Sequence, residues 1–333
     1  MRYFIGTDLG GTKTHTIIVD ENGQVVGFGE AGPGNHQSVG YDGTSKTLHT
    51  ALSQALQSSG LKQPDIAGAG FGIAGYDWPS QRPRMVEIIR ELGITAPFAL
   101  VNDTIPGLVA GSEEGWGVVV VSGTGCNCRG WDREHQREGR VTGYGVLMGE
   151  GAGATELVFR AMQLIGFEWT TRGPQTALSQ VFTEYVNARD LEDLIEGYTA
   201  GYYAIDGKAA PLVFHVAEAG DCVATELVQW AGRELGDLAV GVIHQLQFEQ
   251  LVFDVVLTGS MFEGGPLLIE PMRETIHRAA PGARLTRLTI PPVIGAAIIG
   301  MEQTGLKANS AVRQNLVESL SKLRQTSSQK TIL

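Results

Sequence analysis

Two segments of the chain, about 115 residues apart, share one local organisation: an apolar strand, a turn of glycine and threonine, and a second strand. The first turn contains Gly10-Gly11-Thr12 and the second contains Gly123-Thr124-Gly125. A repeat of this kind indicates a duplicated domain, with the boundary between the copies near residues 111–117. The chain is long enough for two domains, because 333 residues exceed the size at which single cores usually divide.

The first copy has the pattern of an α/β domain. Residues 2–8, 15–20 and 24–28 are apolar or β-branched, and a tight-turn signal at Asp20–Gly23 joins the last two segments, which predicts a three-stranded antiparallel meander. The elements expected next are a helix at 42–59, a strand at 66–73, a helix at 80–92, a strand at 97–101 and a helix at 104–111. Strands that alternate with helices indicate parallel pairing.

From Trp116 the pattern begins again. The elements expected here are strands at 118–121 and 126–131, a mostly helical region at 150–247, a strand at 251–257, a small-residue helix at 293–301 and an amphipathic helix at 310–324. We therefore predict domains at 1–113 and 114–305, a C-terminal helix at 306–325 and a disordered tail at 326–333.

Composition restricts the partners and the compartment. A net charge of −11 offers no basic field for nucleic acid or an anionic membrane surface, so neither is expected as a partner. The three cysteines, Cys126, Cys128 and Cys222, are too few for a disulfide framework, which favours a reducing compartment. No stretch has the length of a secretion signal or the roughly 20 apolar residues of a membrane span. A cytoplasmic location is therefore expected.

The strongest motif runs from Asp8 through Gly10, Gly11, Thr12 and Lys13. Glycines allow backbone N–H groups to approach phosphate oxygens, and a carboxylate at the end of a strand can hold Mg²⁺ through water. An ordinary glycine turn would explain the glycines but not Asp8, Thr12 and Lys13. The motif is not a P-loop, because a strand follows it instead of a helix.

Two further motifs fit the same chemistry. The turn at Gly123, Thr124 and Gly125 could clamp the β- and γ-phosphates of one nucleotide together with the first turn, each from its own domain. The segment 257–265 ends a strand in small residues, including Gly259 and Ser260, that could pack against a flat adenine, although such a loop can also be purely structural.

Asp103 lies where an apolar strand meets a helix, the position from which α/β enzymes present catalytic groups. The same residue could simply cap the helix. The glycine-rich run at 149–154 loosely matches a dinucleotide-binding pattern, but no strand directly precedes it, which argues against that interpretation. Cys126 and Cys128 lack a second pair of ligands, which argues against a metal site.

Taken in order, these motifs resemble the N-acetylglucosamine kinases and the BadF/BadG/BcrA/BcrD ATPase family, within the superfamily of sugar kinases, actin and heat-shock chaperones. The resemblance covers residues 3–303 and is carried by eight segments: 8–12, 34–36, 72–75, 102–103, 122–128, 143–150, 257–260 and 292–296. It implies two duplicated ribonuclease H-like, actin-like ATPase domains with a nucleotide cleft between them. It also implies an ATP-dependent sugar kinase that uses Mg²⁺ and forms a homodimer.

The resemblance also implies roles for individual residues. Asp103 would be the general base for the sugar 6-hydroxyl, and Asp8 would hold Mg²⁺ through water. The positions that match ATP- and phosphate-binding residues are Asp8, Gly10, Gly11, Thr12, Lys13, Gly123, Thr124, Gly125, Gly259 and Ser260. The positions that match substrate-binding residues are Asn35, His36, Ala74, Gly75, Asp103, Asn127, Tyr144, Gly145 and Glu150.

The sequence departs from the family pattern at the sugar site. The family usually has Asp-Glu where this chain has Glu150-Gly151, and Tyr144 stands where tryptophan is common in the animal N-acetylglucosamine kinases. N-acetylglucosamine is therefore the first substrate to consider, with glucosamine or another hexose as alternatives. Other possible classes are an ATPase that activates a partner enzyme, a sugar-responsive regulator, and a filament or chaperone of the actin type; the cysteine arrangement argues against the first and the acidic charge against the second.

Overall fold

The structure is a computed structural model that describes residues 1–330. The chain divides into two compact units, Met1–Gly117 together with Thr286–Leu333, and Val118–Leu285. Among the described residues, the strands form two five-stranded sheets, with the orders β3-β2-β1-β4-β5 and β8-β7-β6-β9-β10. In each unit, the strand that comes first along the chain lies at the centre of the sheet. The second and third strands follow on one side of it, and the fourth and fifth follow on the other. The two units therefore share one topology, as the repeated strand-turn-strand pattern predicted.

The first sheet contains the predicted meander. Strands β1 (Tyr3–Leu9), β2 (Thr14–Asp20) and β3 (Val25–Ala31) pair antiparallel in sequence order. Strands β4 (Ile66–Ile73) and β5 (Phe98–Asn102) then add in parallel, β4 beside β1 and β5 beside β4. Parallel pairing requires helical crossovers, which is why helices separate these strands along the chain.

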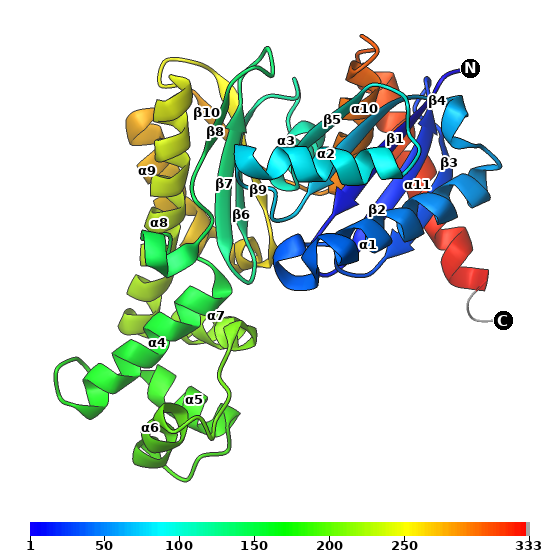
Figure 1. Ribbon diagram of the computed structural model, residues 1–333. Helices are drawn as coiled ribbons and strands as arrows, with labels where there is room; N and C mark the ends of the chain where they lie inside the picture. The colour runs from blue at the N-terminus through cyan, green and yellow to red at the C-terminus, as the bar shows by residue number, and fades with distance from the viewer. Residues whose placement is uncertain (331–333) are drawn as a thin grey trace. The chain divides into compact units, whose positions relative to one another are not determined.

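Helices cover both faces of this sheet (Figure 1). Helices α1 (His36–Ser59) and α2 (Arg82–Glu91) pack on one face, with Leu48, Ile88 and Phe71 in the shared core. Helix α1 begins six residues before the prediction of 42 and is interrupted at Gly40, whose φ of 69° and ψ of 169° are not helical. Helix α3 (Thr104–Gly111) follows β5 directly, as expected.

The boundary predicted at residue 305 is wrong. Helix α10 (Pro292–Glu302) packs its backbone directly on the first sheet: a Cβ at Gly6 would lie 2.3 Å from the nitrogen of Ala297, and one at Gly70 would lie 2.1 Å from the oxygen of Ala296. Such close packing needs glycine in the strands and small residues in the helix. Residues 286–305 therefore belong with the first unit and not with the second.

Helix α11 (Ser310–Lys330) also belongs to the first unit. Its Arg313 donates to the carbonyl oxygen of Val109 at 2.9 Å near the end of α3, and its Ser319 accepts a hydrogen bond from the backbone N–H of Val25 at 3.0 Å. Helix α11 extends to Lys330 and so overlaps the tail predicted for 326–333. Residues 331–333 lie outside the described residues.

The second unit is a sheet with an additional set of helices (Figure 1). Its strands are β6 (Gly117–Ser122), β7 (Cys126–Trp131), β8 (Glu138–Arg140), β9 (Phe253–Thr258) and β10 (Ala283–Arg287). Its helices are α4 (Ala154–Trp169), α5 (Ala177–Tyr185), α6 (Leu191–Thr199), α7 (Ala210–Glu218), α8 (Cys222–Leu246) and α9 (Pro266–Ala279). The sequence did not predict β8 or β10. Within residues 1–330, no helix has both the length and the apolar character needed to cross a bilayer.

Candidate active site

The carboxyl ends of three parallel strands meet at one edge of the first sheet. Asp8 on β1 lies beside Gly72 on β4, and Gly72 lies beside Val101 on β5. Asp103 follows β5, and a Cβ at Gly72 would lie 3.4 Å from the Cα of Asp103. The fold therefore brings together the two carboxylates that the sequence selected, at the edge where open α/β sheets bind ligands.

The electrostatics of this edge couple these two side chains. Burial, and after it the Asp103 carboxylate, raise the pKa of Asp8 to about 7, and Lys13 opposes the shift. A buried carboxylate that is costly to ionise is stabilised by a nearby cation. Asp8 thus has the chemistry of a ligand for a metal ion or for its bound water. Among the described residues, no group of three or more His, Cys, Asp and Glu side chains could hold a metal ion.

The Gly10–Lys13 turn has the geometry of a phosphate loop. The backbone N–H of Gly10 donates to the carbonyl oxygen of Lys13 at 3.0 Å, which closes the turn between β1 and β2. Gly11, Thr12 and Lys13 are exposed, and a Cβ at Gly11 would meet no described atom within 4 Å. The turn therefore leaves room for a ligand to approach its backbone.

Asn35, His36, Ala74 and Gly75 converge beside the same edge. The backbone N–H of Ala74 donates to the carbonyl oxygen of Leu9 at 2.8 Å. Gly75 has a φ of 78°, and a Cβ there would lie 2.2 Å from Oδ1 of Asn35 and 3.1 Å from Nδ1 of His36. Only glycine fits this position. The Oδ1 atom of Asn35 also caps α1 by accepting the N–H of Gln37 at 2.9 Å, so the amide group is held in one orientation.

The surroundings of His36 favour the neutral form of its imidazole. Burial lowers its pKa, and Asp77 only partly opposes this effect. Gln81 Oε1 accepts the N–H groups of Asp77 and Trp78, so its Nε2 must be the donor toward Nε2 of His36, 3.3 Å away. The proton of His36 therefore lies on Nδ1, which is buried and has no hydrogen-bond partner among the described residues. Such a donor is a candidate contact for a ligand oxygen.

The second unit places the other Gly-Thr turn at the beginning of a helix. The N–H of Gly123 donates to the carbonyl oxygen of Gly125 at 2.9 Å, and the N–H of Thr155 in α4 donates to the carbonyl oxygen of Thr124 at 3.0 Å. A Cβ at Gly123 or Gly125 would meet no described atom within 4 Å. The open turn and the positive end of the α4 dipole together form a suitable environment for phosphate.

A cavity of about 580 Å³ opens beside this turn. Its lining includes Gly123 and Thr124 from the turn, Ser260 after β9, and residues that the sequence did not select: Thr155, Lys208 and Phe214. A Cβ at Gly264 would lie 2.1 Å from the Phe214 ring, so glycine is required where this loop meets α7. A lining that combines polar groups with the Phe214 ring suits a nucleotide, and the volume is that of a typical small-molecule site. No local sequence signal marks Phe214, because it lies on an ordinary amphipathic helix.

Asn127, Tyr144, Gly145 and Glu150 gather around a loop of the second unit. Glu150 is buried, and its carboxylate accepts three hydrogen bonds: from the N–H and hydroxyl of Thr142, at 2.7 and 2.8 Å, and from the N–H of Tyr144, at 3.0 Å. Oδ1 of Asn127 is buried and has no hydrogen-bond partner among the described residues, and the Tyr144 side chain is half-exposed. Glu150 therefore holds the shape of this loop.

The match to a family model decides the classification. Residues 5–300 match the model of the BadF/BadG/BcrA/BcrD ATPase family. The chain belongs to this ATPase family. The resemblance deduced from the ordered motifs is confirmed, and membership of an ATPase family implies the use of ATP.

Relatives of this ATPase family member are sugar kinases, in agreement with the predicted enzyme class. The N-acetyl-D-glucosamine kinase of Dictyostelium discoideum is 28% identical over 317 residues, which cover 90% of this chain and 97% of the relative. The N-acetylmuramic acid/N-acetylglucosamine kinase of Clostridium acetobutylicum is 25% identical, over 91% of this chain and 99% of the relative. The glucosamine kinase of Vibrio cholerae is 22% identical over 74% of this chain and 82% of the relative.

Solved structures confirm the two-domain actin-like fold. A candidate N-acetylglucosamine kinase from Chromobacterium violaceum matches with a TM-score of 0.63 and 22% identity, over 90% of this chain and 99% of that protein. A ROK family glucokinase from Streptomyces griseus, solved with glucose and AMPPNP, matches with a TM-score of 0.55 and 18% identity, over 90% and 99% of the two chains.

Proposed function

We propose that this protein is an ATP-dependent kinase that phosphorylates an amino sugar, with N-acetylglucosamine as the first candidate and the 6-hydroxyl as the acceptor. The observation that carries the proposal is the position of Asp103. It lies at the carboxyl edge of the first sheet, close enough to Asp8 to raise the pKa of that residue. The Asp103 side chain makes no capping hydrogen bond to α3, which supports a role other than capping.

Asp103 would act as a general base. Its carboxylate would accept the proton of the sugar hydroxyl while the hydroxyl oxygen forms a bond to the γ-phosphorus and the bond from that phosphorus to the bridging oxygen of ADP breaks. Positioning and charge stabilisation supply most of the catalysis in such reactions. Mg²⁺, when bound, would offset the phosphate charge, and Asp8 is the residue that would hold it through water.

The remaining residues would orient the two substrates. The Gly10–Lys13 turn and the turn at residues 123–125 would bind phosphate oxygens through backbone N–H groups. The cavity beside Thr155 and Phe214 would hold the nucleoside. Asn35 and His36 would offer donors to sugar oxygens, because the Oδ1 atom of Asn35 is engaged by α1 and the proton of His36 lies on Nδ1.

The names of the relatives support an amino sugar but differ in which one. They include N-acetylglucosamine, N-acetylmuramic acid and glucosamine. The departures at Tyr144 and Glu150 fall in the loop that would face the sugar. Glucosamine or another hexose is therefore the alternative substrate within the same reaction.

A coupled assay of ADP release with Mg-ATP tests the proposal. The panel contains N-acetylglucosamine, glucosamine, N-acetylmuramic acid, N-acetylmannosamine, glucose and buffer alone. Stimulation by one amino sugar, with a phosphorylated sugar detected by mass spectrometry, is the expected result. ADP release that no sugar changes would contradict the proposal and favour an ATPase that acts on a partner protein.

A further inference from the structure

The side chain of Asn102, and not that of Asp103, caps the N-terminus of helix α3. It is the last residue of β5, and its side chain is 1% exposed. Its Oδ1 atom accepts hydrogen bonds from the backbone N–H of Thr104 at 3.0 Å and from the Thr104 hydroxyl at 2.8 Å. Asp103 stands at the N-cap position of α3 without a side-chain capping hydrogen bond. The start of α3 is therefore held by Asn102.

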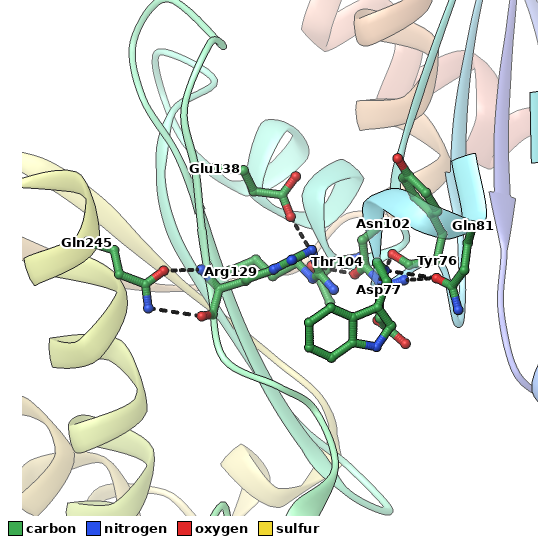
Figure 2. A network of polar contacts seen from close by, with 10 residues as sticks. Tyr76, Asp77, Gln81, Asn102, Thr104, Arg129, Glu138 and Gln245 are labelled. Atoms are coloured by element: carbon green, nitrogen blue, oxygen red, sulfur yellow. Dashed lines mark hydrogen bonds and ion pairs between the residues drawn. The ribbon is translucent and has the colours of Figure 1, made fainter. Parts of the chain in front are cut away.

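The other end of the same side chain holds a different segment. Nδ2 of Asn102 donates to the carbonyl oxygen of Tyr76 at 3.2 Å and to Oδ1 of Asp77 at 3.1 Å, as Figure 2 shows. These residues lie in the loop that follows β4 and carries Ala74 and Gly75. An asparagine amide has both an acceptor and two donors, and here both kinds are used. One buried side chain thus joins the segment bearing Asp103 to the loop after β4.

From Asp77 the contacts continue to the start of α1. Oδ2 of Asp77 accepts from Nε2 of Gln37 at 3.2 Å, and the N–H of Asp77 donates to Oε1 of Gln81 at 2.8 Å. Gln81 in turn lies against His36. Residues 35–37 and 74–78, termed here the acceptor segments, are therefore tied to the end of β5 through Asn102 and Asp77. Linked hydrogen bonds of this kind fix geometry more strongly than isolated pairs do.

We propose that Asn102 is a positioning residue for phosphoryl transfer, which sets the place of the Asp103 carboxylate relative to the acceptor segments. The inference rests on the proposed kinase function. Asn102 itself is too buried to touch a substrate, so its effect is exerted through Asp103 and Asp77. A shift of about 1 Å in a reacting group can cost about 10²-fold in rate.

The variant Asn102→Asp tests the role with little change in shape. An aspartate can still accept from Thr104, but it cannot donate to Asp77 or to the carbonyl oxygen of Tyr76, and two carboxylates would face each other across 3.1 Å. At pH 8 we expect kcat for the sugar to fall about 10²-fold, with KM for ATP within about twofold of wild type. Paired carboxyl groups share one proton at lower pH. The ratio of variant to wild-type kcat should therefore recover as pH falls, which a purely structural defect would not produce.

The double variant Asn102→Asp with Asp77→Asn reverses the hydrogen bond and should rescue the rate. The amide introduced at position 77 could donate to the carboxylate introduced at position 102 and still accept from Gln37. We expect kcat of the double variant to return to within about tenfold of wild type. Asn187→Asp, at an exposed residue of the second unit, adds the same charge and should match wild type. Thermal unfolding of each variant checks that the loss is not a failure to fold.

The outcomes distinguish a failure of the proposed kinase function from a failure of the positioning role of Asn102. A wild type without sugar-dependent ADP release would overturn the proposed function, and the inference with it. A wild type that responds to sugar, with an Asn102→Asp variant at wild-type kcat, would overturn the inference alone. A double variant no faster than the single variant would likewise exclude positioning through Asp77.

Discussion

Gly259 lies directly against Ser122: a Cβ atom at residue 259 would lie 2.1 Å from the carbonyl oxygen of Ser122 and 2.5 Å from its carbonyl carbon. The φ of Gly259 is 110°, a conformation that side chains with a Cβ rarely adopt. Ser122 immediately precedes the Gly-Thr turn. The loop after β9 therefore packs closely against the backbone of the residue that precedes the turn at residues 123–125.

Gly259→Ala should weaken nucleotide binding, because Ser122 and the turn after it must move to accept the new methyl group. We expect the Kd for a non-hydrolysable ATP analogue, measured by calorimetry, to rise at least about tenfold, or about 1.4 kcal/mol. Gly241→Ala on α8 is the matched control, since its Cβ would meet no described atom within 4 Å. An unchanged Kd in Gly259→Ala would show that the turn does not bind the nucleotide.

Asp103→Asn should stop phosphoryl transfer while leaving ATP binding intact. The amide keeps the size of the side chain but cannot accept the sugar proton, so we expect kcat to fall by about 10²- to 10⁴-fold. Asp42→Asn is the control, because the Asp42 side chain is fully exposed on α1. Coupled ADP release gives the rate and calorimetry gives the ATP affinity. Near-normal turnover in Asp103→Asn would refute its role as the base.

Asp8→Asn should stabilise the metal-free protein at high pH. A carboxyl whose pKa rises from 3.8 to about 7 on folding favours the folded state less once it ionises. The loss of unfolding free energy caused by this ionisation is absent below the ordinary pKa and grows between about pH 4 and 7. It is complete above about pH 7, where it reaches at most about 4 kcal/mol. The gain in unfolding free energy from Asp8→Asn should therefore increase from pH 5 to pH 8.

Urea unfolding in the presence of a chelator measures this gain. Asp42→Asn again serves as the control, and its effect should not follow the same pH dependence. If the difference between wild type and Asp8→Asn is the same at pH 5 and pH 8, burial does not perturb Asp8 as described.

Glu150→Gln should loosen the loop that would face the sugar. A glutamine oxygen can still accept from Thr142, but its amino group would face the N–H of Tyr144, which donates to Oε2 at 3.0 Å in the wild type. A hydrogen bond to a charged group is worth about 1.5–3 kcal/mol. We expect KM for the sugar to rise by about tenfold or more while KM for ATP stays unchanged.

Glu134→Gln, at an exposed residue, is the control for the loss of charge. Steady-state kinetics with each substrate varied in turn separates the two KM values. Equal changes in both KM values would indicate a general loss of structure in the second unit and would contradict a specific role for the loop.

Much of the fold could be predicted from local patterns. The antiparallel meander β1–β3 and the strands β4, β5, β6 and β7 follow from apolar runs separated by glycine turns. The same patterns placed Asp8 and Asp103 at strand ends. The short strand β8, with the sequence Glu-Gly-Arg, was not predicted because it contains no apolar run. It forms through pairing with the neighbouring strand β7.

The sequence by itself determined the duplicated strand-turn-strand units and the two glycine-threonine turns, because hydrophobic period and turn chemistry act between residues close in the chain. The tertiary structure decided that α10 packs on the first sheet and that Asn102, not Asp103, caps α3. It also decided that Glu150 holds Thr142 and Tyr144. The packing of α10 and the contacts of Asn102 with Tyr76 and Asp77 join segments that are far apart in the chain, and local patterns do not encode such contacts.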